Sequence, residues 1–335
     1  MRAETNKNPE AYSGFLLLNK KPGFTSFETL NRIKEAFAPS KVGHTGTLDK
    51  FASGLLIALV GRAVKLTSWF TGTEKEYEGT IRLGQETDTL DPEGTVIGEA
   101  EPPSPEALAE VLDSFRGNIL QAPPAYSAVH IDGERASVLA RNGMSPEMRK
   151  RPVTIYALEL RSYESSLARI YVRCSKGTYI RSLARDIALA AGSRGYLAAL
   201  TRTATAGFTL ADAVEIEGAA IEGAAIEGAT LYGAELYRAL RPIDTAAFAA
   251  LGIKQITLDE ITAAKIHKGF PLRAILEESR LLQRQIPHLE GETGVGLFDV
   301  RGELLAVIEK KPFAGRSPVL ESWRYGYVYA RAREP

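Results

Sequence analysis

Asp49 stands in a glycine-rich stretch that could hold a single carboxylate in a fixed place. Lys41–Gly54 contains three glycines, one histidine and two threonines, and the apolar run Leu55–Val60 follows it. Glycine reaches backbone conformations closed to other residues, so such a loop can turn tightly and let a ligand approach its main chain. No second acid lies beside Asp49 in the sequence, which argues against a hydrolase with paired carboxylates. A role as a simple turn or helix cap stays open from the residues alone.

Two further side chains could act together with Asp49. Arg181 lies at a predicted strand-to-helix junction. An arginine beside a partly buried carboxylate keeps the acid ionised and orients it through two parallel hydrogen bonds. Tyr77 lies on a predicted strand, where an aromatic ring can support a nucleotide base. A surface arginine and an ordinary core tyrosine would explain these two residues as well.

A metal site is not expected. His44 precedes Asp49 by five residues, but a metal ion needs several ligands at suitable spacing. The other histidines and the single cysteine are scattered, at His130, Cys174, His267 and His288. A metal-dependent hydrolase built around His44 is therefore disfavoured.

Alternating apolar patterns predict the elements that must position these residues. Predicted strands lie at 15–18, 55–60, 77–83, 126–131, 153–163 and 168–175. Predicted helices lie at 26–37, 63–71, 105–116 and 179–191, and residues 135–151 are predicted to be helical and then basic. Thr25 and Glu28 form a capping box for the first helix, whose apolar side would contain Phe27. Residues 85–94 are predicted to be a polar, acidic loop.

Charge is sorted along the chain although the formal net charge is zero. Residues 1–73 hold ten Lys and Arg against five Asp and Glu, and residues 125–210 hold thirteen against six. Residues 74–113 hold two against twelve. This asymmetry favours one face that attracts phosphate, with chance clustering as the alternative. A single cysteine, the lack of a signal peptide and the lack of a long apolar run predict a cytoplasmic protein away from membranes.

Six segments of the sequence resemble, in order, those of the tRNA pseudouridine-55 synthases, the bacterial TruB family. Together they cover most of residues 14–210, and the resemblance thins out beyond. The segments are LLLNKKPGFTS (16–26), HTGTLDKFASGLL (44–56), KEYEGTIRLGQETDTLDPEG (75–94), QAPPAYSAVHIDGERA (121–136), CSKGTYIRSLARDIA (174–188) and LTRTATAGF (200–208).

The resemblance implies isomerisation of uridine 55 in the TΨC loop of tRNA to pseudouridine, without metal or organic cofactor. It implies that Asp49 is the nucleophile, paired with Arg181. Tyr77 would stack on the target base, as a candidate for proton removal from C5, and Leu200 would pack against that base. His44 would fill the space left by the flipped nucleotide. Further RNA contacts are expected at Lys20, Lys176, Tyr179, Arg202 and the basic run 149–151.

The predicted fold class is α/β (α+β), with a mostly antiparallel central sheet and a cleft, followed by a small C-terminal β domain. The resemblance implies the pseudouridine synthase fold at 14–245, with an insertion subdomain at about 75–150. Residues 1–13 are predicted to be disordered. Residues 216–235 repeat Ile-Glu-Gly-Ala or a similar unit every five residues. Four such units are too few to stack into a stable solenoid, so this segment is predicted to be a low-complexity insertion. Residues 246–335, predicted to be strand-rich with a hairpin at 295–298 and 304–308, match the family's RNA-binding, often PUA-like, domain by position.

The sequence departs from the family where Lys50 replaces the usual proline after the catalytic aspartate, which removes a fixed φ angle. Asn19 and Lys21 replace the more usual aspartate and proline of the first segment. Two rival functions stay open: an RNA-binding module without chemistry, and a guide-RNA-dependent synthase of the dyskerin type acting on ribosomal RNA. The short neutral ends disfavour the second, so we expect a monomer that needs tRNA and no protein partner.

Overall fold

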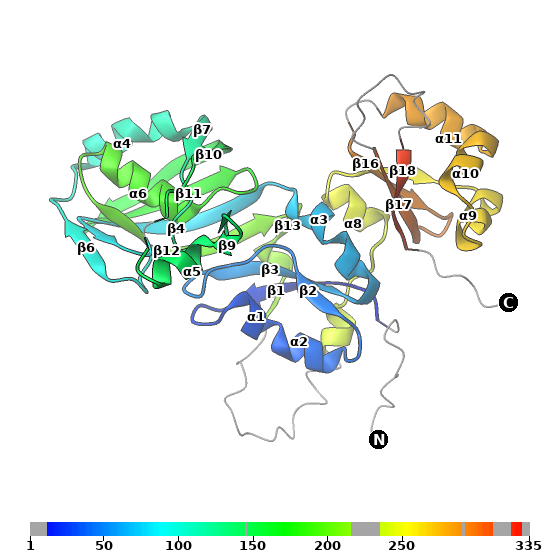
Figure 1. The fold of residues 1–335 in the computed structure, drawn as a ribbon, viewed down its shortest axis with the longest axis horizontal. Helices are drawn as coiled ribbons and strands as arrows, with labels where there is room; N and C mark the ends of the chain where they lie inside the picture. Colours follow the sequence, from blue (N-terminus) through cyan, green and yellow to red (C-terminus); the bar gives the residue numbers. More distant parts are fainter. Residues whose placement is uncertain (1–11, 145, 216–234, 290–291, 311–322, 330–335) are drawn as a thin grey trace.

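The computed structural model describes residues 12–144, 146–215, 235–289, 292–310 and 323–329. In this part of the chain a ten-stranded sheet forms the centre, and a four-stranded sheet lies beyond α3 and α8 (Figure 1). The predicted N-terminal disorder lies outside the described residues except at its last two positions, and so does the predicted repeat except at its last residue. No described helix is long and apolar enough to cross a membrane.

The central sheet has the strand order β14-β1-β3-β12-β4-β11-β10-β7, with β2 beside β3 and β13 beside β12. Only β1 with β14 and β3 with β12 pair in parallel, so the sheet is mostly antiparallel, as predicted. The strands are β1 (Gly14–Lys20), β2 (Val42–His44), β3 (Ser53–Val60), β4 (Lys75–Leu83), β7 (Gly117–Gln121), β10 (Arg151–Glu164), β11 (Leu167–Cys174), β12 (Gly195–Thr205), β13 (Phe208–Thr209) and β14 (Val214–Glu215).

Both faces of the sheet are covered around β1 and β3. Leu16 and Leu18 of β1 belong to one apolar cluster, and Phe15 and Leu17 belong to another on the opposite face. Successive side chains of a strand point to opposite faces, so burial on both sides explains why this strand is a continuous apolar run rather than an alternation. The first cluster is covered by α2 (Asn31–Ala36), α4 (Pro105–Leu112) and α6 (Ile180–Ala190), and the short helix α1 (Ser26–Thr29) precedes α2.

Several predicted boundaries are wrong. The helix predicted at 26–37 is two short helices, α1 and α2, and Phe27 is 66% exposed instead of buried. The strand predicted at 126–131 exists only as β8, and the helix predicted from 135 is only α5. The acidic loop at 85–94 begins as a strand, β5, that pairs with β6. The elements are β5 (Gln85–Thr87), β6 (Val96–Glu99), β8 (His130–Ile131), β9 (Glu134–Arg135), α5 (Ala136–Arg141), η1 (Gly61–Leu66), α3 (Thr67–Thr71), η2 (Asp113–Phe115) and η3 (Leu210–Asp212).

Several caps and turns of the structure follow from the local residues. The capping box of Thr25 and Glu28 is present at the start of α1. Asp132 and Gly133 both take positive φ angles in the turn between β8 and β9. Gly192, with φ 72°, follows the end of α6, as the left-handed cap of a helix requires.

The C-terminal region contains the predicted hairpin, β16 and β17, but the residues before it are mainly helical rather than strand-rich. Phe248 and Phe298 of this region pack in the same apolar cluster as Phe15 and Leu55 of the central sheet. The two sheets therefore share a core. The elements are α8 (Thr245–Ala250), β15 (Lys254–Thr257), α9 (Glu260–His267), α10 (Leu272–Glu278), α11 (Arg280–Gln285), η4 (Ile286–His288), β16 (Gly294–Phe298), β17 (Leu304–Lys310) and β18 (Trp323–Val328).

Candidate active site

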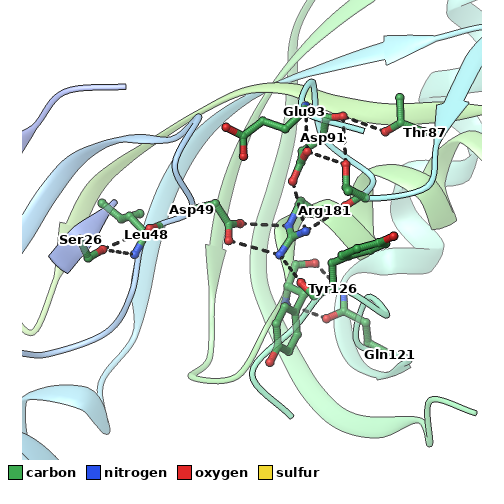
Figure 2. Close-up of polar contacts among 11 residues, drawn as sticks. Ser26, Leu48, Asp49, Thr87, Asp91, Glu93, Gln121, Tyr126 and Arg181 are labelled. Atoms are coloured by element: carbon green, nitrogen blue, oxygen red, sulfur yellow. Dashed lines mark hydrogen bonds and ion pairs between the residues drawn. The ribbon is translucent and has the colours of Figure 1, made fainter. Parts of the chain in front are cut away.

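Asp49 and Arg181 meet in a two-point ion pair, although they lie 132 residues apart in the chain. Arg181 Nε lies 3.0 Å from Asp49 Oδ2, and Arg181 Nη2 donates to Asp49 Oδ1 at 3.2 Å (Figure 2). The arginine side chain is 7% exposed and the aspartate side chain 39% exposed. The carboxylate is therefore held in one orientation by a buried cation while part of it faces solvent.

The remaining donors of Arg181 are all used. Arg181 Nη1 donates to Asp91 Oδ2 at 3.2 Å and to the carbonyl of Thr89 at 2.9 Å, and Nη2 donates to the carbonyl of Tyr126 at 3.1 Å (Figure 2). A guanidinium has five N–H donors in a planar fork. With every donor engaged, its plane cannot rotate without breaking several hydrogen bonds, so it fixes the Asp49 carboxylate rigidly.

Asp91 is a second carboxylate in the site. Asp49 has no acidic neighbour in the sequence, but the fold brings Asp91 to the same arginine. Its Oδ1 accepts from Thr89 Oγ1 at 2.6 Å and from the main-chain N–H of Glu93 at 3.0 Å. A Cβ on Gly94 would lie 2.3 Å from Thr89 Oγ1, so this turn closes only around glycine. In the sequence, a local sign of this turn is that Asp91 follows Thr89 by two residues, a spacing at which an aspartate can hydrogen-bond within a turn.

The first turn of α6 holds Arg181 in an unusual position. Cations are disfavoured at the N-terminus of a helix because the peptide dipoles make that end positive. The carboxylates of Asp49 and Asp91 offset this cost at Arg181. Gln121, which sequence reasoning missed, fixes the start of the helix, because its amide accepts from the Tyr179 N–H at 2.8 Å and donates to the Tyr179 carbonyl at 3.1 Å.

The main chain around Asp49 is held from several sides. Ser26 Oγ, which is buried, accepts from the Leu48 N–H at 2.9 Å and donates to the Leu48 carbonyl at 3.1 Å (Figure 2). The Gly23 N–H donates to the Lys50 carbonyl at 2.8 Å. The residues on both sides of Asp49 are thus attached to the turn after β1, through Gly23, and to the first residue of α1, Ser26.

Lys20 and Arg202 do not fit the phosphate contacts expected of them. Both side chains are buried. Lys20 Nζ donates to the carbonyls of Ala52 and Lys21, and burial lowers the pKa of this lysine to about 8. Arg202 Nε donates to the Leu55 carbonyl at 2.7 Å, and its Nη2 donates to the Gly46 carbonyl at 3.2 Å. Both cations instead donate hydrogen bonds to main-chain carbonyls in and next to the glycine-rich stretch.

At Gly54, strand β3 approaches strand β12 closely. The φ of this glycine is 103°, and a Cβ there would lie 2.3 Å from the Arg202 carbonyl. Only glycine fits this close contact between β3 and β12, which places the loop of Asp49 beside Arg202.

Tyr77, Leu200 and Arg202 lie on one face of the sheet. Tyr77 of β4 is the register partner of Arg202 on β12, and Gly79 is the partner of Leu200. Tyr77 and Leu200 are each 7% exposed and belong to the apolar cluster that α6 covers. Burial raises the pKa of Tyr77, against the opposing charge of Arg202, so the phenol stays protonated at neutral pH.

His44 lies at the end of β2 and is half-buried, and its Nδ1 has no hydrogen-bond partner. Burial and then the charges of Arg202 and Lys34 lower the pKa of His44, so the imidazole is neutral at neutral pH. Tyr179 is the residue before α6, whereas Lys176 is exposed in the preceding turn. No group of three or more potential metal ligands occurs among the residues that the structure describes.

Replacing Ser26 with alanine is expected to lower the free energy of unfolding by about 1–3 kcal/mol, because a buried N–H and carbonyl of Leu48 lose their partner. Urea unfolding followed by circular dichroism measures this change. Ser114, whose exposed hydroxyl donates only to the Val111 carbonyl, supplies the matched control in Ser114→Ala. Equal stability of the two variants would show that Ser26 does not hold the loop.

Known proteins resemble this chain in sequence and in fold. The family profile described as "TruB family pseudouridylate synthase (N terminal domain)" matches residues 34–180. A protein of Borreliella burgdorferi (strain ZS7) named tRNA pseudouridine synthase B is 50% identical over 208 residues, which are 61% of this chain and 74% of the relative. The protein of that name from Francisella tularensis subsp. novicida is 43% identical over 215 residues, 63% of this chain and 71% of the relative.

Among solved structures, the crystal structure of a Cbf5-Nop10-Gar1 complex contains a chain with a TM-score of 0.64 to this one at 20% identity. The match covers 99% of this chain and 88% of that chain, which confirms the predicted fold class. The family is assigned from the relatives in sequence. At 50% identity over 74% of a named relative, with the family profile across the segment that contains Asp49, the chain belongs to the TruB family of pseudouridylate synthases.

Proposed function

We propose that this chain isomerises uridine 55 in the TΨC loop of tRNA to pseudouridine, with Asp49 as the nucleophile acting on a flipped-out nucleotide. The main support is the two-point ion pair, in which the buried Arg181 holds the partly exposed carboxylate of Asp49. The relatives named tRNA pseudouridine synthase B support tRNA as the substrate class.

The reaction breaks the C1′–N1 bond of uridine, turns the uracil and forms a C5–C1′ bond. The proton on C5 is released and N1 takes up a proton, so the change is redox-neutral. A carboxylate suits this chemistry because it can form a covalent adduct and leave again, or offset positive charge on the ribose. The glycal, acylal and Michael-type routes all start from an ionised Asp49, which is the form that Arg181 favours.

The target base must leave its stack, at a cost of a few kcal/mol. Tyr77 and Leu200 lie on one face of the sheet with 7% of each residue exposed, and we propose that the base reaches this exposed edge, where base–aromatic stacking contributes about 1–3 kcal/mol. Because the phenol of Tyr77 is protonated at neutral pH, its surroundings favour stacking over proton removal from C5.

The neutral, half-buried His44 suits the space left by the flipped nucleotide better than a contact with phosphate. Among the cations expected to bind RNA, the exposed Lys176 and the exposed run Arg149–Arg151 remain candidates for phosphate contacts. Tyr179 lies next to Arg181 and is proposed to line the nucleotide-binding surface.

Residues 246–335 are proposed to be a PUA-like RNA-binding domain. A cavity of about 610 Å³ lies between α9 and the turn after β16, and its lining includes the basic residues His267, Lys268 and Arg301 beside the acidic Glu260 and Asp299. We propose that the chain works as a monomer on tRNA without a protein partner. Activity of the pure chain on tRNA alone tests this part of the proposal.

Mapping the modified nucleotide in a tRNA transcript incubated with the pure protein tests the assignment. Pseudouridine at position 55, together with release of tritium from C5-labelled uridine, is the expected result. Binding without tritium release would support an RNA-binding module. Pseudouridine only when a guide RNA and further proteins are added would support the dyskerin-type alternative.

Activity is expected to fall in acid over a higher pH range than that of an ordinary aspartate, about 3.9. Burial raises the pKa of Asp49, the Arg181 guanidinium opposes this rise, and the Asp91 carboxylate adds to it. The ionised form is the active one, so kcat/KM is lost as pH falls through this raised pKa. A pH profile of kcat/KM, over the range in which circular dichroism shows folded protein, measures the acid limb.

Asp91→Asn removes the like charge, so its acid limb should lie at lower pH than that of the wild type, although its activity is lower throughout. Asp113→Asn is the matched control, because Asp113 is exposed at the end of α4. An acid limb that is identical in all three proteins would show that Asp91 does not act on the ionisation of Asp49.

A further inference from the structure

Lys50 closes a ring of contacts around the active site. Its Nζ lies 4.0 Å from Glu93 Oε1. The Glu93 N–H donates to Asp91, Asp91 accepts from Arg181, and Arg181 holds Asp49, the neighbour of Lys50 in the chain (Figure 2).

The link between Lys50 and Glu93 contributes little to stability. Both side chains are about half exposed, at 52% and 49%, and 4.0 Å is the outer limit of an ion pair. Exposed pairs of this kind are screened by water and salt. The Lys50 ammonium can therefore leave Glu93 for another anion at little cost.

Asp49 is partly exposed, and Lys50, which follows it directly in the chain, is about half exposed, so both side chains are open to an RNA that reaches the site. Lys20, whose charge also acts on Asp49, is buried and directed at main-chain carbonyls, so it cannot meet a phosphate. Lys50 has both the exposure and the position to do so.

We propose that Lys50 binds an RNA phosphate beside the target nucleotide, and that Glu93 competes with this phosphate for the ammonium. The proposal rests on the function proposed above and adds a binding residue to that site. It differs from a purely structural role for the pair in one respect. A phosphate contact makes loss of Lys50 and loss of the Glu93 charge act in opposite directions on RNA binding.

The test compares Lys50→Ala, Glu93→Gln and the double variant by filter binding of an unmodified tRNA transcript at several salt concentrations, and by KM and kcat. Lys50→Ala is expected to weaken binding about fivefold, mainly through KM. It should also reduce the slope of log K against log salt by about 0.7–0.9, the contribution of one phosphate contact. Glu93→Gln is expected to strengthen binding by a similar factor, and the double variant should behave like Lys50→Ala.

Arg161 and Glu159 form a comparable exposed pair at 2.8 Å on β10, on the side of that strand opposite the buried Leu158. Arg161→Ala and Glu159→Gln are therefore matched controls for charge. Changes in the same direction for Lys50→Ala and Glu93→Gln, or an unchanged salt slope in Lys50→Ala, would overturn the phosphate contact. Wild-type protein that binds tRNA but forms no pseudouridine would instead refute the proposed function. The salt dependence of tRNA binding would still show whether Lys50 contacts a phosphate.

Discussion

Replacing Asp49 with asparagine is expected to lower kcat for pseudouridine formation by roughly 10⁴-fold or more, because the amide is neither a nucleophile nor a counter-charge for the ribose. Tritium release from C5-labelled uridine in tRNA measures this loss. Binding of tRNA is expected to change little, since the asparagine side chain has the same size and Arg181 keeps its contacts to Asp91, Thr89 and Tyr126.

The control for this variant is Asp113→Asn, which changes the same functional group at an exposed position. Filter binding of unmodified tRNA separates loss of chemistry from loss of binding. Retained turnover in Asp49→Asn would remove Asp49 from the mechanism. Loss of binding equal to the loss of turnover would assign it a role in holding RNA instead.

Replacing Arg181 with lysine is expected to lower kcat by roughly 10²-fold or more while keeping the charge. A lysine has three donors on one atom, whereas Arg181 uses five donors in a plane to reach two carboxylates and two carbonyls. The ammonium cannot hold both oxygens of Asp49, so the nucleophile loses its fixed orientation.

The same variant is expected to be less stable by about 2–5 kcal/mol, because the carbonyls of Thr89 and Tyr126 and one carboxylate lose buried partners. Urea unfolding measures this change. Arg185→Lys is the matched control, since Arg185 lies one turn further along α6 and contacts only its partly exposed neighbour Asp186 among the ion pairs of the described residues. If Arg181→Lys kept full activity, the two-point ion pair would not be needed for chemistry.

The two large effects have a common origin in the placement of charge. Arg181 occupies the end of α6 that disfavours a cation, and two carboxylates from distant segments are required to hold it there. Such a local conflict, resolved by tertiary contacts, is typical of functional sites.

The sequence alone determined the elements whose signals are local. The capping box at Thr25, the hairpin of β16 and β17 and the alternation on β4 each depend on residues a few positions apart, and each is present. The resemblance to the family also supplied Asp49, Tyr77 and Arg181, because those residues lie in motifs long enough to stand out.

Only the tertiary structure decided what surrounds these residues. Asp91, Gln121 and Ser26 enter the site through contacts between segments 22–90 residues apart, and no local pattern encodes such a pairing. Lys20 and Arg202 looked like surface cations because charge in a sequence carries no record of burial. Their burial follows from the packing of β1, β3 and β12 around carbonyls that need donors. A buried polar group is stable only where its hydrogen-bond partners meet it, and the fold of the whole chain fixes those meeting points.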